Sequence, residues 1–290
     1  MPFIRLIVFS NFFVSLCVAA LNYRTFLYFN FPPSNALLIL VFSATYIIYN
    51  FQRLVRMNQK EIDEANIGFR MKWVYNNKHP IIFTIVLAAI ILVVSLSYLN
   101  IKTIIVLAIM GVFSVVYVVR IIPYHQKWLA FRDIPFLKIF VIAFVWTLVT
   151  GLLPLISKDV SQINLQHILF LTKQFLFVVA ITIPFDIRDM KYDVEKGIKT
   201  FPLVVGVKIT LVLGVLLLLG FVAISSYEFL ILHTINIKLW IAEIIAILVV
   251  MLLLLLSKKQ QPELFYSFII EGTSLLLAIT VIANVVKQSV

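Results

Sequence analysis

Long apolar runs, separated by short polar segments, make up most of the chain. A helix needs about 20 mainly apolar residues to cross the hydrocarbon core of a bilayer, and nine runs are close to this length. No long segment alternates apolar and polar residues in the way that barrel strands do. The pattern therefore predicts an all-α, polytopic membrane protein with nine transmembrane helices. The predicted spans are residues 3–21, 35–49, 80–99, 103–119, 135–156, 166–185, 209–225, 237–256 and 264–286.

The composition supports a lipid environment. Hydrophobic residues make up 62% of the 290 residues, and the mean hydropathy is +1.07, whereas a soluble domain contains about 45–50%. A water-soluble fold is excluded. The single cysteine, Cys17, lies in the first apolar run, which excludes an intramolecular disulfide and a cysteine-based metal site. The net charge of +11 is explained by basic cytoplasmic loops, so we expect no nucleic-acid partner.

Basic residues are distributed unevenly between the two sets of loops. If the spans alternate, 17 Lys and Arg residues fall on the side of the N-terminus and 5 on the side of the C-terminus. Short loops that are rich in Lys and Arg remain in the cytoplasm. We therefore expect the N-terminus and the two long polar loops, 53–78 and 188–208, to be cytoplasmic. The C-terminus is expected on the opposite side of the membrane.

The two long polar loops follow the second and the sixth span. The corresponding ends of these spans are 135 residues apart, which is about half the chain. Membrane proteins that are built from two related halves often place a site where the halves meet. We interpret residues 1–290 as a single transmembrane domain whose two pseudo-related halves meet near residue 134.

Three aspartates, Asp186, Asp189 and Asp193, follow the sixth span. Their spacing of three and four residues places them on one face of a helix. Like charges at such short distances repel unless a cation lies between them, and carboxylate oxygens suit Mg²⁺, which commonly joins carboxylates to a substrate phosphate. The alternative is a solvated acidic helix end that is balanced by neighbouring basic residues.

The segment from Asp186 to Gly206 resembles a known motif. Gly197, Thr200 and Pro202 follow the aspartates, and the whole segment is similar to the second aspartate-rich motif of the UbiA superfamily of intramembrane prenyltransferases. The resemblance implies a bundle of nine helices around a central cavity, in which magnesium held by two aspartate-rich motifs binds an isoprenyl diphosphate. It also implies that the prenyl group is transferred to a lipophilic, often aromatic, acceptor.

The resemblance also implies roles for individual residues. Asp186, Asp189 and Asp193 would be the catalytic ligands of Mg²⁺. Further residues in the two motif segments and in the fifth and ninth spans would bind the substrate. These residues are Asn50, Lys138, Arg188, Lys199 and Glu271.

The first aspartate-rich motif is where the chain departs from the family pattern. Asn50 is retained, but three positions at which the family has aspartates carry other side chains. These are Phe51, Leu54 and Asn58. Two symmetrically bridged metal ions are therefore not expected. We predict that Arg53 or Arg56 binds the anionic substrate in place of a second cation, because guanidinium groups match phosphate geometry.

Aromatic side chains and one acidic side chain complete the set of candidates. Four aromatic residues could line a cavity and stabilise a carbocation through their ring faces. They are Tyr46, Tyr49, Tyr117 and Trp146. Glu243 lies inside the eighth span, where an isolated charge is costly, so we expect it to pair with a neighbour or to face a polar cavity.

Other functions fit parts of the pattern. A terpene cyclase of the UbiA type has the same fold but captures the carbocation within one chain. A non-catalytic membrane protein that binds a lipid or an anion would account for the loss of carboxylates from the first motif. A secondary transporter is disfavoured, because the two halves lack broken apolar spans at matching positions.

Overall fold

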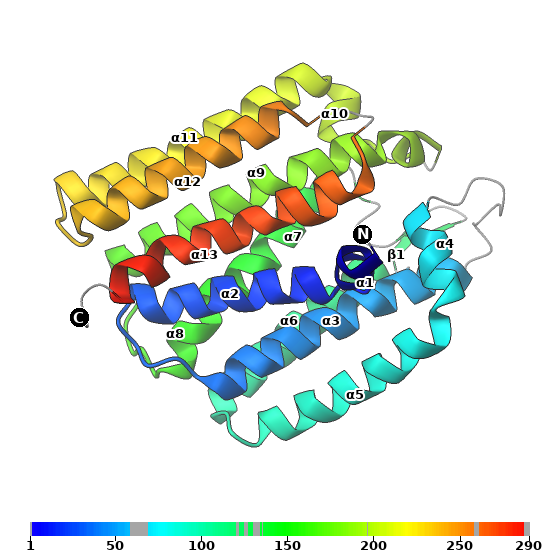
Figure 1. Ribbon diagram of the computed structural model, residues 1–290, viewed down its shortest axis with the longest axis horizontal. Helices are drawn as coiled ribbons and strands as arrows, with labels where there is room; N and C mark the ends of the chain where they lie inside the picture. The colour runs from blue at the N-terminus through cyan, green and yellow to red at the C-terminus, as the bar shows by residue number, and fades with distance from the viewer. Residues whose placement is uncertain are drawn as a thin grey trace.

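Helices lie side by side in one bundle and account for almost all of the residues that the structure describes (Figure 1). The computed structural model describes residues 2–58, 69–119, 122–124, 127–129, 134, 136–195, 197–257 and 261–286. Its α-helices are α1 (Pro2–Phe9), α2 (Phe12–Tyr28), α3 (Asn35–Asn58), α4 (Phe69–Asn76), α5 (Lys78–Leu96), α6 (Ile101–Val118), α7 (Leu137–Thr147), α8 (Leu153–Ser157), α9 (Leu165–Glu195), α10 (Phe201–Val204), α11 (Val207–Leu230), α12 (Ile237–Leu255) and α13 (Glu271–Val286). Two π-helical segments, η3 (Leu148–Leu152) and η4 (Phe265–Ile270), connect α7 to α8 and precede α13.

The long apolar helices confirm a polytopic, helical membrane protein. Every predicted span overlaps a helix or a consecutive series of helices. Among the described residues, seven helices are long and apolar enough to cross a membrane, and the number is eight if the bent pair α1–α2 counts as one span. The apolar part of α6, Ile101–Val115, is shorter than these. The count of nine spans therefore stays a prediction.

The first predicted span is broken rather than straight. α1 and α2 meet at an angle of 67°, and Asn11 between them has a left-handed φ of 66°, a conformation that asparagine adopts more readily than most residues. The side-chain Nδ2 of Asn11 donates to Oδ1 of Asn50 (2.9 Å), and Nδ2 of Asn50 donates to the carbonyl oxygen of Ser10 (2.9 Å). An amide from α3 thus stabilises the break.

α9 extends well beyond the end of the predicted sixth span. Its 31 residues have a length of about 46 Å at 1.5 Å per residue, compared with about 30 Å for the hydrocarbon core. The helix continues through Pro184 and carries all three aspartates on its final turns. α3 likewise continues to Asn58, so both motif segments are helical and lie toward the same end of the bundle (Figure 1).

A short antiparallel hairpin between α6 and α7 is an exception to the predicted all-helical fold. β1 (Ile122–Tyr124) pairs with β2 (Lys127–Leu129), and Pro123 lies opposite Trp128. Each strand has three residues. An alternating pattern needs four or more residues to be recognised in a sequence, so the pattern did not predict the hairpin.

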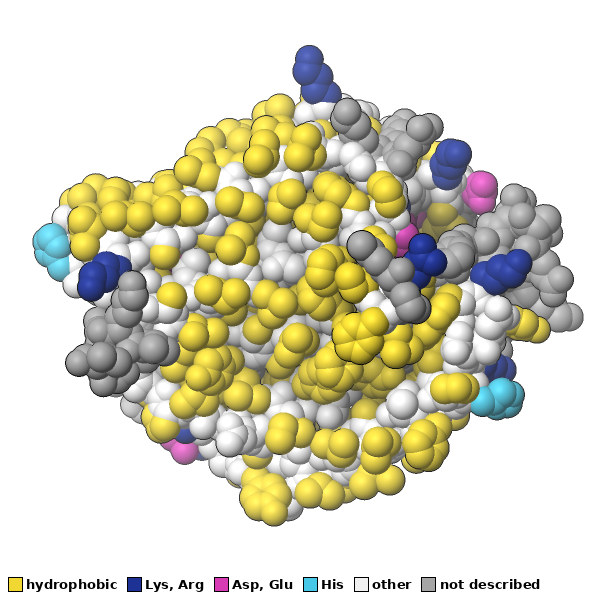
Figure 2. All heavy atoms as spheres, viewed as in Figure 1, with side chains coloured by type: hydrophobic (Ala, Val, Ile, Leu, Met, Phe, Trp, Pro, Cys, Tyr) yellow, Lys and Arg dark blue, Asp and Glu magenta, His cyan; other side chains and the backbone are white. Residues whose placement is uncertain are grey.

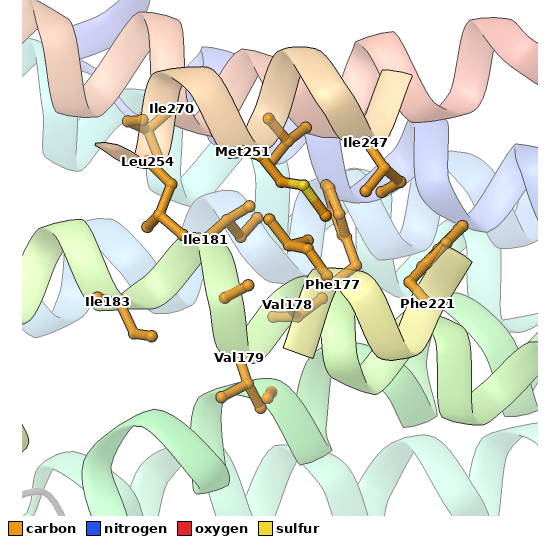
Figure 3. Close-up of a cluster of buried hydrophobic side chains, with 14 of the residues drawn as sticks. Phe177, Val178, Val179, Ile181, Ile183, Phe221, Ile247, Met251, Leu254 and Ile270 are labelled. Atoms are coloured by element: carbon orange, nitrogen blue, oxygen red, sulfur yellow. The ribbon is translucent and has the colours of Figure 1, made fainter. Parts of the chain in front are cut away.

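The main hydrophobic core lies between α9, α11 and α12 (Figure 3). Phe177 of α9, Phe221 of α11 and Ile247 of α12 are fully buried in it. Gly214 lets α11 approach closely, because a Cβ at this position would lie 2.7 Å from Cδ2 of Leu254. Small residues commonly allow such approach between membrane helices. This packing fixes the position of α9.

The outer face of the bundle is apolar. Figure 2 shows hydrophobic side chains spread across the visible face, with charged side chains mainly toward its edges. Phe83 on α5 and Val112 on α6 are 71% and 62% exposed. Scattered exposure of this kind over many helices is what a lipid-facing surface requires.

A buried charge network joins four helices away from the aspartates. Glu243 of α12 lies 2.6 Å from Arg24 of α2 and 3.0 Å from Lys173 of α9, and Lys173 lies 2.5 Å from Glu228 of α11. All four side chains are fully buried. The prediction that Glu243 pairs with a neighbour is confirmed.

Candidate functional site

A cavity of about 220 Å³ lies between α3, α7, α9 and α13, near the polar ends of α3 and α9. Part of its wall is apolar and comes mainly from α7 and α9. Four basic and three acidic side chains lie on the remainder of the wall. They are Arg53, Arg70, Lys138, Arg188, Asp186, Asp189 and Glu271. The cavity therefore offers several cationic groups to an anion, with acidic groups at the same end.

The three aspartates of α9 surround the ammonium group of Lys138. Nζ of Lys138 lies 2.8 Å from Oδ1 of Asp186, 3.7 Å from Oδ2 of Asp189 and 3.8 Å from Oδ2 of Asp193. Asp186 and Asp193 are buried, whereas 28% of the Asp189 side chain is exposed. The predicted common face of the aspartates is thus present, and a single cation already lies among them.

The start of α7 holds Lys138 opposite α9. The backbone N–H of Phe136 donates to the carbonyl oxygen of Lys199 (3.1 Å), and the ring of Phe136 packs edge-on against Phe201, with centroids 4.9 Å apart. Ile139 is buried in the core shared with α9. A cation in the first turn of a helix is disfavoured by the helix dipole, so the nearby carboxylates compensate the charge of Lys138.

Arg188 is engaged by acidic groups on two sides. Its Nε and Nη2 donate to Oδ1 and Oδ2 of Asp189 (2.8 and 3.3 Å), and its Nη1 donates to Oε1 of Glu263 (3.2 Å). Glu263 lies just before η4. The guanidinium group is therefore held at the cavity wall by contacts with both α9 and the segment that leads into α13.

Glu263 lies between two arginines of the site. Nη1 of Arg70 also donates to its Oε1 (2.9 Å), and Ser267 donates to the same oxygen (3.1 Å). Burial alone would raise the pKa of Glu263, but the guanidinium groups of Arg188 and Arg70 hold it below its usual range. Burial lowers the pKa of Arg70 from its ordinary value. The three groups form an ion-paired cluster beside the cavity.

The face that α3 turns to the cavity is not the one that the first motif suggested. Tyr49, Gln52 and Arg53 line the cavity, and Nη1 of Arg53 donates to the carbonyl oxygen of Phe9 (2.8 Å). Phe51 is 42% exposed and lies outside the described lining. Arginine and glutamine thus occupy the side of the cavity where the family resemblance implies aspartates.

The remaining predicted site residues differ in whether they line the cavity. Asn50 is fully buried at the α1–α2 break and does not line the cavity. Lys199 is exposed in the loop after α9. Glu271 lines the cavity wall on α13. The side chain of Arg56 lies outside the described residues, as does that of Tyr117.

The aspartates carry the kind of donor atom that a hard divalent cation binds, but their oxygens are arranged around Nζ of Lys138. Carboxylate oxygens are the preferred protein ligands of Mg²⁺, and Nζ of Lys138 shows that a cationic atom fits within 3.8 Å of all three side chains. Within the parts of the chain that the structure describes, no group of three or more acidic, histidine or cysteine side chains is arranged to hold a metal ion. Metal binding would require Lys138 to move.

An apolar cavity of about 90 Å³ adjoins the charged one. Both cavities are lined by Tyr49, Ser114 and Trp146, and Nε1 of Trp146 donates to the Tyr49 hydroxyl (3.2 Å). Beyond this pair the walls are formed mainly by apolar side chains, together with Gly111 and the hydroxyl side chains of Thr45 and Ser114. Tyr46 instead hydrogen-bonds Thr84 (2.8 Å). The two cavities together suit a molecule with an anionic head and an apolar tail.

Sequence reasoning missed Gln52, Arg70 and Glu263. Gln52 and Arg53 follow Tyr49 at helical spacings of three and four residues, so periodicity could have identified this face of α3. Arg70 and Glu263 come from segments that are 193 residues apart. Nothing in the local sequence distinguishes them from other charged loop residues.

Comparison with known proteins identifies the fold. No protein-family model and no curated protein sequence matches the chain, but several solved structures do. A UbiA homologue from Archaeoglobus fulgidus bound to Cd²⁺ has a TM-score of 0.62 at 16% identity, covering 99% of this chain and 100% of that one. The structure of a UbiA homologue from the same organism bound to GPP and Mg²⁺ has a TM-score of 0.61 at 15% identity, with 97% and 99% covered. A structure described for digeranylgeranylglyceryl phosphate synthase has a TM-score of 0.56 at 17% identity, with 98% and 99% covered.

These matches extend over nearly the whole chain. The chain has the fold of the UbiA homologues, and the resemblance that the segment from Asp186 to Gly206 suggested is confirmed at the level of the fold. The fold also agrees with an integral membrane protein built from apolar helices.

Proposed function

We propose that this membrane protein with the UbiA fold is a prenyltransferase of the UbiA superfamily. It transfers a prenyl group from an isoprenyl diphosphate to a lipophilic or aromatic acceptor. The supporting observation is the pair of adjoining cavities, in which a charged end with four basic side chains leads past Tyr49 and Trp146 to an apolar end. An isoprenyl diphosphate has the same two parts, and the GPP bound by a protein of this fold is such a molecule.

The basic side chains of the charged end bind the diphosphate. When the bond between the prenyl carbon and the diphosphate oxygen breaks, both electrons remain on the diphosphate, and its negative charge must be stabilised. Arg53 and Arg188 offer guanidinium groups, which bind phosphates through two parallel hydrogen bonds. Lys138 and Arg70 add positive charge from the neighbouring walls.

Asp186, Asp189 and Asp193 are the residues that would hold Mg²⁺. A bound Mg²⁺ supplies further neutralisation of charge on the departing diphosphate. Proteins of this fold have been solved with Mg²⁺ and with Cd²⁺. Because Phe51 and Leu54 lack carboxylates, the chain uses one metal site, and Arg53 or Arg56 supplies positive charge in place of the second metal.

The apolar end accommodates the prenyl tail and the reacting carbon. Tyr49 and Trp146 line both cavities, and the faces of aromatic rings stabilise cations. The aliphatic walls exclude water that would otherwise capture the allylic cation. A carbon of the acceptor's electron-rich ring then supplies the electron pair of the new bond to the prenyl carbon and loses its proton to the departed diphosphate. Glu271 contacts the substrates from the wall of α13.

A specific observation also supports a non-catalytic, anion-binding protein. The side of the cavity formed by α3 carries Gln52 and Arg53 and has no carboxylate among its described residues. Such a protein would bind the diphosphate without cleaving it. Release of diphosphate in the presence of an acceptor would separate the two functions, and formation of a cyclic product without an acceptor would indicate a terpene cyclase.

The direct test is equilibrium binding of radiolabelled GPP to the purified full-length chain in detergent with Mg²⁺. Asp186→Asn and Arg53→Gln should each weaken binding by about 30-fold or more, because losing one partner of a buried charged contact costs about 2–5 kcal/mol. Matched controls are Asp159→Asn and Lys102→Gln, which alter an exposed ion pair of 3.0 Å. Equal binding by the wild type and both site variants would refute the proposed donor site.

A further inference from the structure

Lys138 occupies the point toward which the aspartates of α9 converge. One ammonium group lies within 3.8 Å of an oxygen from each of Asp186, Asp189 and Asp193. A divalent cation bound by the same three carboxylates would lie in the same place. Two cations at this separation would repel each other, so the ammonium group and the metal cannot both occupy it.

The backbone on either side of this point is fixed, but the Lys138 side chain has freedom to move. Ile139 and Ala143 bury the adjacent face of α7 against α9, and the N–H of Phe136 is bound to the carbonyl of Lys199. Lys138 itself has a flexible four-carbon stem, its side chain is 18% exposed, and it lines the 220 Å³ cavity. Its ammonium group can therefore leave the aspartates without any movement of the helices.

Charge favours such an exchange. Lys138 brings one positive charge to three carboxylates, and Asp189 is also bound by Arg188. Mg²⁺ brings two positive charges and prefers carboxylate oxygens over other ligands. The ammonium group itself lies 3.7 and 3.8 Å from the oxygens of Asp189 and Asp193, which is longer than a hydrogen bond, so it holds these two carboxylates only weakly.

We propose that the ammonium group of Lys138 and a divalent metal ion exchange with each other at the three aspartates of α9. Without metal, its ammonium group holds the three aspartates together. When metal binds, the ammonium group leaves them and turns into the cavity, where it becomes a hydrogen-bond donor to an anion. Metal binding thereby adds one positive charge to the anion site. The binding of Mg²⁺ by the aspartates and the identity of that anion, the diphosphate of the donor, both rest on the proposed function.

The test measures Mg²⁺ binding by calorimetry on the full chain in detergent, with no diphosphate present. Lys138→Met removes the competing charge and keeps a similar length. Because the repulsion between the ammonium group and the metal is then absent, we expect Mg²⁺ affinity to rise about tenfold or more. Lys138→Arg keeps a positive charge and should bind Mg²⁺ no more tightly than the wild type. The control Lys102→Met lies in an exposed pair with Asp159 and should leave affinity unchanged. Equal Mg²⁺ affinity in Lys138→Met and the wild type would overturn the exchange.

A second measurement uses the wild type and does not depend on the folding of a variant. Labelling of Lys138 by an amine-reactive reagent, quantified by mass spectrometry, should increase severalfold on addition of Mg²⁺, because the amine leaves its ion pairs. Labelling of Lys102 should not change. Constant labelling of Lys138 at saturating Mg²⁺ would overturn the proposal. Failure of the donor-site proposal would appear separately, as absence of GPP binding.

Discussion

Ion pairs hold the charged side chains around the cavity in place. Lys138 is held by the three aspartates of α9, and Arg188 is shared between Asp189 and Glu263. An unpaired charge in such surroundings is costly, so removing one partner of an ion pair would destabilise the folded chain. A bound anion would compete for these cations with acidic groups that are already present.

The contribution of Glu263 to the stability of the fold should depend on pH. Its pKa lies below the usual value, so its stabilising contribution is complete above the unfolded-state pKa of about 4.3 and is lost as the pH falls through the folded-state pKa. Glu263→Gln should therefore lower stability at pH 7 by about 1–3 kcal/mol. The difference from the wild type should narrow as the pH falls below about 4.

Thermal unfolding in detergent at pH 7 and at about pH 4 provides the comparison. The exposed Glu195 offers a control, and Glu195→Gln should leave the melting temperature at pH 7 nearly unchanged. If Glu263→Gln and the wild type melted at the same temperature at pH 7, the ion-paired cluster with Arg70 and Arg188 would not stabilise the fold.

Local spacing predicted some of these residues but not their partners. The common face of Asp186, Asp189 and Asp193 follows from helical periodicity, which acts over a few residues. The contacts of Arg188 with Glu263 and of Lys138 with Asp186 join elements that are far apart in the chain, 75 residues in the first case. Such contacts depend on how the helices pack, which the sequence pattern does not specify.

At the scale of elements, the apolar runs predicted where the helices lie, but they did not predict where the helices end or bend. The predicted sixth span stops at residue 185, whereas α9 continues to Glu195 because polar residues after a membrane segment can remain helical. The bend between α1 and α2 depends on the left-handed backbone of Asn11 and on a bond to Asn50 from another helix. Neither feature alters the hydropathy pattern.

The α1–α2 break leads to a prediction about Asn50. Asn50→Ala removes three hydrogen bonds, to Asn11, Ser10 and Tyr46, and leaves buried polar groups without these partners. We expect a loss of about 1–3 kcal/mol, seen as a lower melting temperature. The exposed Asn76 is the matched control, and Asn76→Ala should melt with the wild type. An unchanged melting temperature for Asn50→Ala would show that the break does not need this amide.

At the scale of the whole molecule, hydrophobicity predicted a membrane bundle, and the matches to UbiA homologues extend over nearly the whole chain. The orientation in the membrane, the nine-span count and the relation of two halves near residue 134 stay predictions. They depend on the lipid environment or on ancestry, and neither is encoded in the packing of the helices. The excess of basic residues near the aspartate end favours a cytoplasmic location for the cavity.

Cysteine labelling tests this orientation. In a Cys17→Ser background, which removes the only native thiol, single cysteines are placed at Asn76, the last residue of α4, and at Lys158, which follows α8. A membrane-impermeant maleimide added to intact cells should label position 158 and should label position 76 only after permeabilisation. Labelling of both positions from the same side would contradict the predicted topology.

The most direct test of the donor site is a cryo-electron-microscopy structure of the full chain with Mg²⁺ and a non-hydrolysable thio analogue of GPP. We predict density for the diphosphate among Arg53, Lys138 and Arg188, with the prenyl tail passing Tyr49 and Trp146 into the apolar cavity. Density for the analogue elsewhere, or an unchanged cavity at saturating analogue, would contradict the account.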